Sequence, residues 1–258
     1  MTDVLLGDTL ILALAGLIAG LVDAIVGGGG LIQLPAMFSV LTQTVPASLF
    51  GTNKFASVWG TLFAARTYAK RLSVEWGTAL PAALTAFLFS MAGAWLVTQT
   101  SPDLIRKSLP FVLLLVAIYV AARKDFGATH APRYSGVAEI GMALMVGAII
   151  GFYDGFFGPG TGSFLLFLFV RLFGFDFLGA SAVAKIVNVA CNFSALIWFG
   201  YSGHILWHLG LVMAASNIVG AVIGTRLAIK GGSALVRQLF LVVVSLLILK
   251  TAKDAFWP

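Results

Sequence analysis

The chain of 258 residues is far too apolar for a soluble domain, because 60% of its residues are hydrophobic and only 10% are charged, against about 25% charged in ordinary soluble domains. Its formal net charge of +6 is typical of some nucleic-acid-binding proteins, but the basic residues lie mostly in short loops between apolar stretches, as membrane orientation requires. Composition therefore predicts an integral membrane protein and excludes nucleic acid as a partner.

Eight apolar stretches are long enough for a helix to cross the bilayer, which takes about 20 residues. In chain order they are residues 10–26, 47–65, 78–97, 104–122, 137–157, 180–199, 205–229 and 234–249, and shorter apolar segments occupy residues 31–41 and 163–173. No Lys or Arg precedes the first stretch, so the basic region of a cleavable signal peptide is missing. The first helix is expected to remain in the mature protein.

The sequence repeats itself after 131 positions, the interval between Asp23 and Asp154. The same shift superimposes Lys54 on Lys185, together with several glycines, a tryptophan and an arginine. Internal repeats of this kind are common in secondary transporters. We therefore predict a first membrane repeat at residues 1–122, a basic cytoplasmic linker at 123–136 and a second membrane repeat at 137–258.

Loop charges indicate that the two repeats are inverted. The loop that carries Arg66, Lys70 and Arg71 is basic, whereas its repeat partner at residues 201–203 is uncharged. Since Lys and Arg gather on the cytoplasmic side, equivalent loops face opposite sides. Five membrane segments per half satisfy this rule and leave both termini outside and the linker inside. Eight full spans with two re-entrant short segments are the alternative.

Two glycine-rich runs interrupt the apolar sequence, at residues 27–30 and at the equivalent residues 158–163. Unpaired backbone at membrane depth is tolerated only where it is buried in protein or lines a polar cavity. A helix that starts after such a break directs N–H groups toward an anion. The runs therefore predict two broken helices around a binding site at the middle of the membrane. Isolated pairs such as Gly16-x-x-x-Gly20 are instead expected to let helices pack closely.

Buried charges sharpen this prediction. A lysine deep in a membrane protein is costly unless it finds a partner or water, so two readings remain open. Lys54 and Lys185 either neutralise the aspartate of their own half, Asp23 or Asp154, or face the cavity and attract an anion. The aspartates are candidates for ion pairing or for carrying a coupled proton.

Each candidate substrate-binding residue either belongs to a glycine run or carries a polar side chain close to one. They are Gly27, Gly28, Gly29, Gly30, Gln33, Asn53, Lys54, Gly158, Gly160, Thr161, Gly162, Ser163, Lys185, Asn188 and Asn192. An intramembrane enzyme would need a catalytic constellation, which the lone Cys191 and three scattered histidines do not provide. We expect no enzyme, no cofactor and no metal site.

Four motifs resemble one known family. They are "GLVDAIVGGGG" at residues 20–30, "GTNK" at 51–54, "GFYDGFFGPGTGS" at 151–163 and "AKIVNVACN" at 184–192. Together they look like the two halves of the sulfite exporter TauE/SafE family, also called the toluene sulfonate uptake permease family, over nearly the whole chain. The resemblance implies secondary transport of sulfite or organosulfonates across the bacterial inner membrane, linked to the proton gradient. A passive anion channel, or a transporter of another small organic anion, is the alternative.

Overall fold

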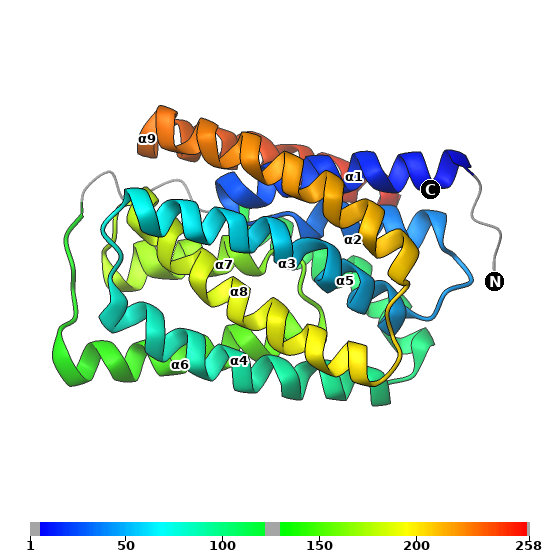
Figure 1. Ribbon diagram of the computed structural model, residues 1–258, viewed down its shortest axis with the longest axis horizontal. Helices are drawn as coiled ribbons and strands as arrows, with labels where there is room; N and C mark the ends of the chain where they lie inside the picture. The colour runs from blue at the N-terminus through cyan, green and yellow to red at the C-terminus, as the bar shows by residue number, and fades with distance from the viewer. Residues whose placement is uncertain (1–5, 122–129, 257–258) are drawn as a thin grey trace.

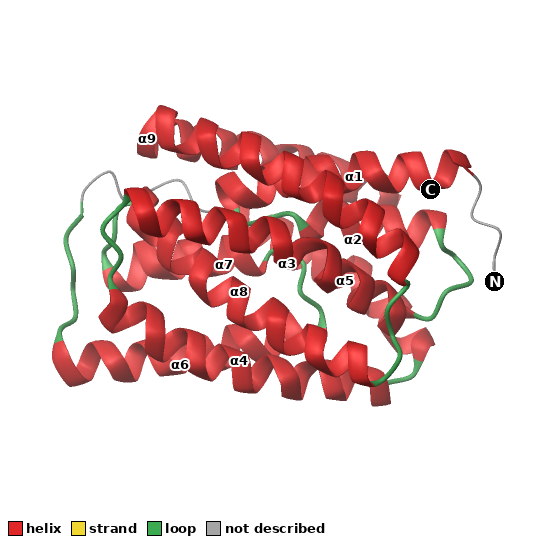
Figure 2. Cartoon of the chain, in the orientation of Figure 1, coloured by secondary structure: helices red, strands yellow, loops and turns green. Residues whose placement is uncertain are grey.

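The computed structural model describes residues 6–121 and 130–256, with the side chains of residues 6–115 and 130–231. In this part of the chain every regular element is helical, with nine α-helices and one π-helical turn, Phe169–Phe173 (Figure 2). The predicted all-α class is confirmed. Residues 123–129, which make up half of the predicted linker, lie outside the described residues.

The helices follow the predicted segments in chain order. The first half contains α1 (Leu6–Val26), α2 (Gly30–Val40), α3 (Pro46–Arg71), α4 (Trp76–Gln99) and α5 (Pro102–Ala121). The second half contains α6 (Gly136–Phe156), α7 (Thr161–Leu168), the π-helical turn, α8 (Phe177–Tyr201) and α9 (Trp207–Phe256). Figure 1 shows that α9 bends back on itself, so that its end lies at the same end of the molecule as its beginning.

Five helices among the described residues are long and apolar enough to cross a membrane, namely α1, α4, α6, α8 and the stretch Trp207–Gly231 of α9. The two predicted short segments form short apolar helices at Gly30–Val40 and Thr161–Phe173. The 26-residue α3 is long enough as well, but the polar residues along it lower its hydropathy. The predicted spans 104–122 and 234–249 fall on α5 and on the end of α9, partly or wholly beyond the described side chains.

Large apolar side chains face outward on several of these helices. Leu10 and Leu14 on α1, Leu84 and Leu88 on α4, and Ile149 on α6 are all more than half exposed. Soluble monomers rarely expose so much contiguous apolar surface. The exposed side chains therefore form a surface suited to lipid.

The helices of one half pack mainly on helices of the other half. The α1 helix packs on α9 and α6 packs on α4, whereas α3 and α8 lie against each other near the centre. Glycines allow the close approaches: a Cβ on Gly20 would lie 2.0 Å from the carbonyl oxygen of Asn217, and one on Gly151 would lie 2.5 Å from Cα of Ala86. The expected role of the isolated glycine pairs in helix packing is confirmed for Gly20 and Gly151.

Equivalent helices run in opposite directions. In Figure 1, α3 runs from right to left and α8 from left to right, and α1 and α6 are opposed in the same way. The start of α1 and the end of α9 lie at the right of the view, whereas residues 130–135 lie at its left. The basic residues Arg66, Lys70 and Arg71 belong to the end of α3, which lies at the left as well.

Candidate functional site

Both glycine runs break a helix, as predicted. The α1 helix ends at Val26, and Gly27 adopts a left-handed backbone with φ 78°. Gly158 occupies the equivalent position after α6 with φ 85°, and Gly160 caps α7 with φ 79°. Only glycine adopts these angles at little cost. These left-handed glycines therefore separate the long helix from the short one in each half.

The two breaks touch each other at the centre of the molecule. A Cβ on Gly27 would lie 2.3 Å from the carbonyl carbon of Gly162. The backbone N–H of Ser163 donates to Gly27 O at 3.0 Å, and the Ser163 hydroxyl donates to Val26 O at 3.0 Å. The broken end of α1 therefore supplies hydrogen-bond acceptors for Ser163 at the start of α7.

Tyrosine hydroxyls fix the backbone beside each break. Tyr68 donates to Ala24 O at 2.8 Å in the first half, and Tyr153 donates to Pro159 O at 2.5 Å in the second. Each hydroxyl satisfies a carbonyl oxygen within five residues of a left-handed glycine, Gly27 or Gly158. Buried backbone groups need such partners when a helix stops inside the protein.

Two buried ion pairs cross between the halves. Lys54 Nζ lies 2.5 Å from Asp154 Oδ2, and Lys185 Nζ lies 3.0 Å from Asp23 Oδ2 and also donates to the backbone oxygen of Asp23. All four residues are buried. The expectation that a pairing lysine would choose the aspartate of its own half is therefore wrong. Asp23 on α1 thus meets Lys185 on α8, and Asp154 on α6 meets Lys54 on α3, so each broken helix pairs with a lysine from the opposite half.

A small polar cavity of about 20 Å³ lies between these groups. Both halves contribute to its lining, with Asp23, Gly27, Gly30, Asn53, Lys54, Ser57 and Thr61 from the first and Asp154, Gly158, Gly160, Thr161, Gly162, Asn188 and Asn192 from the second. A cavity of this size holds about one water molecule. The structure therefore brings most of the predicted site residues together around a space that is too small for a multi-atom anion.

Two residues of this lining, Ser57 and Thr61, were not predicted. They continue the α3 face of Asn53 at intervals of four residues, so the three side chains point the same way. The Thr61 hydroxyl donates to Asp23 Oδ2 at 3.2 Å. The repeat could have identified both, because a shift of 131 positions places Ser57 on Asn188 and Thr61 on Asn192.

Five predicted site residues lie beside the cavity but do not line it. A Cβ on Gly29 would meet Asp23 Cβ and the backbone of α1, and one on Gly28 would lie 3.5 Å from Ser163 Oγ. Gln33 is buried and accepts a hydrogen bond from Ser57 at 3.1 Å. Lys185 reaches the cavity only through Asp23. The five residues that lie beside the cavity without lining it are Gly28, Gly29, Gln33, Ser163 and Lys185.

Two buried polar atoms in this region have no hydrogen-bond partner within the described protein, Asn53 Oδ1 and Gln33 Nε2. Buried polar atoms are normally paired, and an unpaired one needs an explanation such as water or a ligand. Asn53 lines the cavity, and Gln33 is joined to it through Ser57. The unpaired Asn53 Oδ1 thus points to a polar occupant of the cavity, whereas the unpaired Gln33 Nε2 lies behind its lining.

The helices and this site define a multi-pass α-helical membrane protein with a polar centre built by two broken helices. Residues 12–251 match the family model described as sulfite exporter TauE/SafE. The chain belongs to the sulfite exporter TauE/SafE family, and the resemblance of its four motifs is thereby confirmed.

Relatives cover almost the full length of the chain. It is 36% identical over 247 residues to "Probable membrane transporter protein ORF9" of Sinorhizobium sp, covering 96% of this chain and 93% of the relative. It is 34% identical to "Probable membrane transporter protein" of Haemophilus influenzae, with 96% and 95% covered. It is 32% identical to "Probable membrane transporter protein YfcA" of Escherichia coli K12, with 95% and 90% covered. No solved structure matches.

Family and relatives agree on the general activity. The chain is a membrane transporter, not an enzyme. Its substrate is a small molecule and its environment a lipid bilayer. Both halves of the protein contribute side chains to the central cavity.

Proposed function

We propose that the protein is a proton-coupled secondary transporter that moves sulfite or a small organosulfonate across the bacterial inner membrane. The observation that carries this proposal is the exchange of ion pairs between the halves, beside a cavity to which both halves contribute. A site shared between two related halves can open to either side when one half moves against the other. This is alternating access around a site near the middle of the membrane.

Inverted repeats, residues 1–122 and 137–258, are the architecture that we infer for this mechanism. The pairing of Asp23 with Lys185 becomes the pairing of Asp154 with Lys54 when the halves are exchanged. The packing of α1 on α9 likewise becomes that of α6 on α4, and the equivalent helices are opposed in Figure 1. The basic end of α3 favours a cytoplasmic linker with both termini outside.

Anion recognition is supported by the donors around the cavity. Lys54 offers an ammonium group, and Asn188 and Asn192 offer amides from α8. The α7 helix begins at the cavity, where its dipole favours negative charge. Gly160 and Gly162 line the cavity, and no described hydrogen bond is donated by their backbone N–H groups. A sulfonate or sulfite offers three oxygens to such donors.

Charge balance supports proton coupling. The two lysines and two aspartates give the site a formal charge of zero. A monovalent anion that entered alone would leave a buried net charge, which is costly. A proton on one aspartate restores neutrality and releases its lysine for the anion. Asp154 is our choice for the proton, because both it and its partner Lys54 line the cavity, whereas Lys185 does not.

The family supplies the sulfur chemistry of the substrate, because the matching model is that of a sulfite exporter. The geometry of the site favours an anion of modest size. The donors described above do not distinguish sulfite from taurine, sulfoacetate or toluene sulfonate. A direct comparison of these four compounds therefore belongs in the test.

The test is uptake into proteoliposomes that contain the purified protein, with each of the four anions and with or without a pH gradient. We expect saturable uptake of at least one, accelerated by a proton gradient. Asp154→Asn should lose accumulation driven by the pH gradient but retain exchange of labelled for unlabelled substrate. Non-saturable flux that ignores the gradient would favour a passive channel, and exclusive uptake of another organic anion would favour the other alternative.

A further inference from the structure

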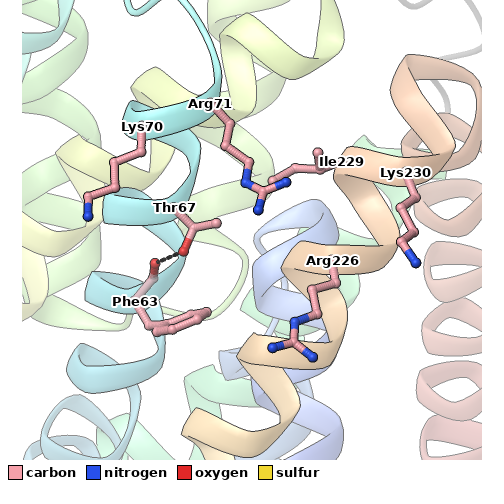
Figure 3. A pocket seen from close by; sticks show the side chains of 7 residues that line it. All are labelled: Phe63, Thr67, Lys70, Arg71, Arg226, Ile229 and Lys230. Atoms are coloured by element: carbon pink, nitrogen blue, oxygen red, sulfur yellow. Dashed lines mark hydrogen bonds between the residues drawn. The ribbon is translucent and has the colours of Figure 1, made fainter.

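A second pocket lies at the basic end of the molecule, between the end of α3 and the middle of α9. It has a volume of about 600 Å³ and is lined by Phe63, Thr67, Lys70, Arg71, Arg226, Ile229 and Lys230 (Figure 3). None of these residues lines the central cavity. We call this pocket the basic crevice.

Among the residues whose side chains the structure describes, the basic crevice gathers four cations and no acidic residue in its lining. The described ion pairs include none of the four. Figure 3 shows Arg71 extending from α3 toward Ile229 on α9, with the Arg226 guanidinium below it. Like charges that line one pocket repel each other, and an anion between them offsets the repulsion. Arginine forks match the oxygens of phosphate in pairs, so Arg71 and Arg226 are suited to bind one from both sides.

The basic crevice also has an apolar part. Phe63 and Ile229 belong to its lining. Exposed apolar side chains continue from it along both helices toward the middle of the molecule, with Trp59 and Leu62 on α3 and Ile223 on α9. A ligand with a phosphate at one end and hydrocarbon below it would match this arrangement. An anionic phospholipid has that shape, and basic pockets between membrane helices are typical sites for its headgroup.

The equivalent place at the other end of the molecule is built differently. The repeat puts Trp198 in the position of Thr67 and Trp95 in that of Arg226. There the Trp198 indole N–H donates to the Thr98 hydroxyl at 3.2 Å, which joins α8 to α4. Two cations of the basic crevice, Arg226 and Lys230, are thus replaced by tryptophan and glutamine. The crevice is a property of one end rather than a consequence of the repeated fold.

We propose that the basic crevice binds the phosphate headgroup of an anionic phospholipid. Arg71 and Arg226 hold the phosphate oxygens, while Lys70 and Lys230 add positive charge at the rim. The acyl chains lie along Phe63 and the exposed apolar side chains below. The occupied crevice joins the end of α3 to α9, two helices from opposite halves. This proposal is independent of the substrate of the central site.

The test measures lipid binding to the detergent-purified full chain by native mass spectrometry, with phosphatidylglycerol and phosphatidylcholine titrated separately. We expect tighter binding of phosphatidylglycerol. Arg71→Gln with Arg226→Gln should weaken it roughly 30-fold, at about fivefold for each cation removed. Arg226→Lys keeps the charge but loses the fork and should weaken binding less than Arg226→Gln. Lys107→Gln is the matched control, because it removes an exposed cation from the opposite end and should leave binding unchanged.

Soluble phosphates distinguish the two possible sources of the headgroup chemistry. Millimolar glycerol 3-phosphate or inorganic phosphate should not displace phosphatidylglycerol from the unmodified protein. Displacement by either compound would overturn the lipid proposal in favour of a soluble ligand. Equal binding of the two lipids, or undiminished binding of phosphatidylglycerol to the folded double variant, would overturn it as well. The competition needs no substitution, so the proposal stays testable even if the variants fold poorly.

Discussion

The crossed ion pairs make a specific prediction for paired substitutions. Lys54 and Asp154 meet at 2.5 Å, and their side chains are 3% and 2% exposed. Asp154→Asn leaves the Lys54 ammonium buried without a counter-charge. Removing one member of a buried pair costs about 3–5 kcal/mol. For a chain of this size that corresponds to about 6–20 °C in Tm.

The choice of the second substitution decides the outcome. Asp154→Asn with Lys54→Met removes both members of one pair, so most of the lost stability should return. Asp154→Asn with Lys185→Met removes one member from each of two pairs and leaves Lys54 and Asp23 unpaired. Each charge left unpaired costs about 3–5 kcal/mol, so this double variant should be less stable than Asp154→Asn alone. Both double variants remove one lysine and one aspartate, so they serve as controls for each other.

Thermal unfolding in detergent, followed by the fraction that remains monodisperse on size exclusion, measures this difference. From most to least stable, we expect the unmodified protein, the crossed double variant (Asp154→Asn with Lys54→Met), the single variant Asp154→Asn, and the own-half double variant (Asp154→Asn with Lys185→Met). An own-half double variant as stable as the crossed one would refute the pairing between halves. If the least stable variants do not accumulate in the membrane, their abundance relative to the crossed double variant gives the same ranking.

Two further predictions concern the break and the topology. Gly27→Ala should destabilise the protein by about 2–5 kcal/mol, because the new Cβ would lie 2.3 Å from the carbonyl carbon of Gly162 and the left-handed backbone is strained for alanine. The control Gly141→Ala lies on a helix with nothing within 4 Å of the new Cβ, so it should leave Tm unchanged or slightly higher. Equal Tm values for the two variants would contradict this prediction. A reporter inserted at 123–135 should indicate cytoplasm and one after Trp257 the outside, whereas the same side for both would exclude five passes in the second half.

The helix breaks could be predicted because a glycine run is a local feature of the sequence, and the 131-residue interval adds a second signal. Four adjacent glycines in an apolar stretch admit few explanations, and Gly27 and Gly158 adopt the left-handed backbone that this reading requires. The interval of 131 residues that relates Asp23 to Asp154 also relates the helices on which they lie. The central placement of most of the candidate residues follows from these two features together.

The ion-pair partners could not be predicted because they depend on packing between distant segments. Sequence proximity favours the pairing of Asp23 with Lys54. In the structure, Asp154 pairs with a lysine 100 positions away and Asp23 with one 162 positions away. The orientation of the glycine run was equally hidden. A run of identical residues has no periodicity, so nothing in it shows that Gly30 lines the cavity while Gly29 packs on α1.

The size of the central cavity makes movement a requirement for transport. About 20 Å³ holds one water, so a multi-atom substrate enters only after the lining has moved, and we expect the two breaks to separate. A Cβ on Gly28 would lie 3.5 Å from Ser163 Oγ, which places a cysteine pair at these positions within disulfide reach. Gly28→Cys with Ser163→Cys, in a Cys191→Ser background, should stop transport when oxidised and recover it on reduction, while each single cysteine stays active. Equal transport by the oxidised and reduced protein would show that substrate passes without separating the two breaks.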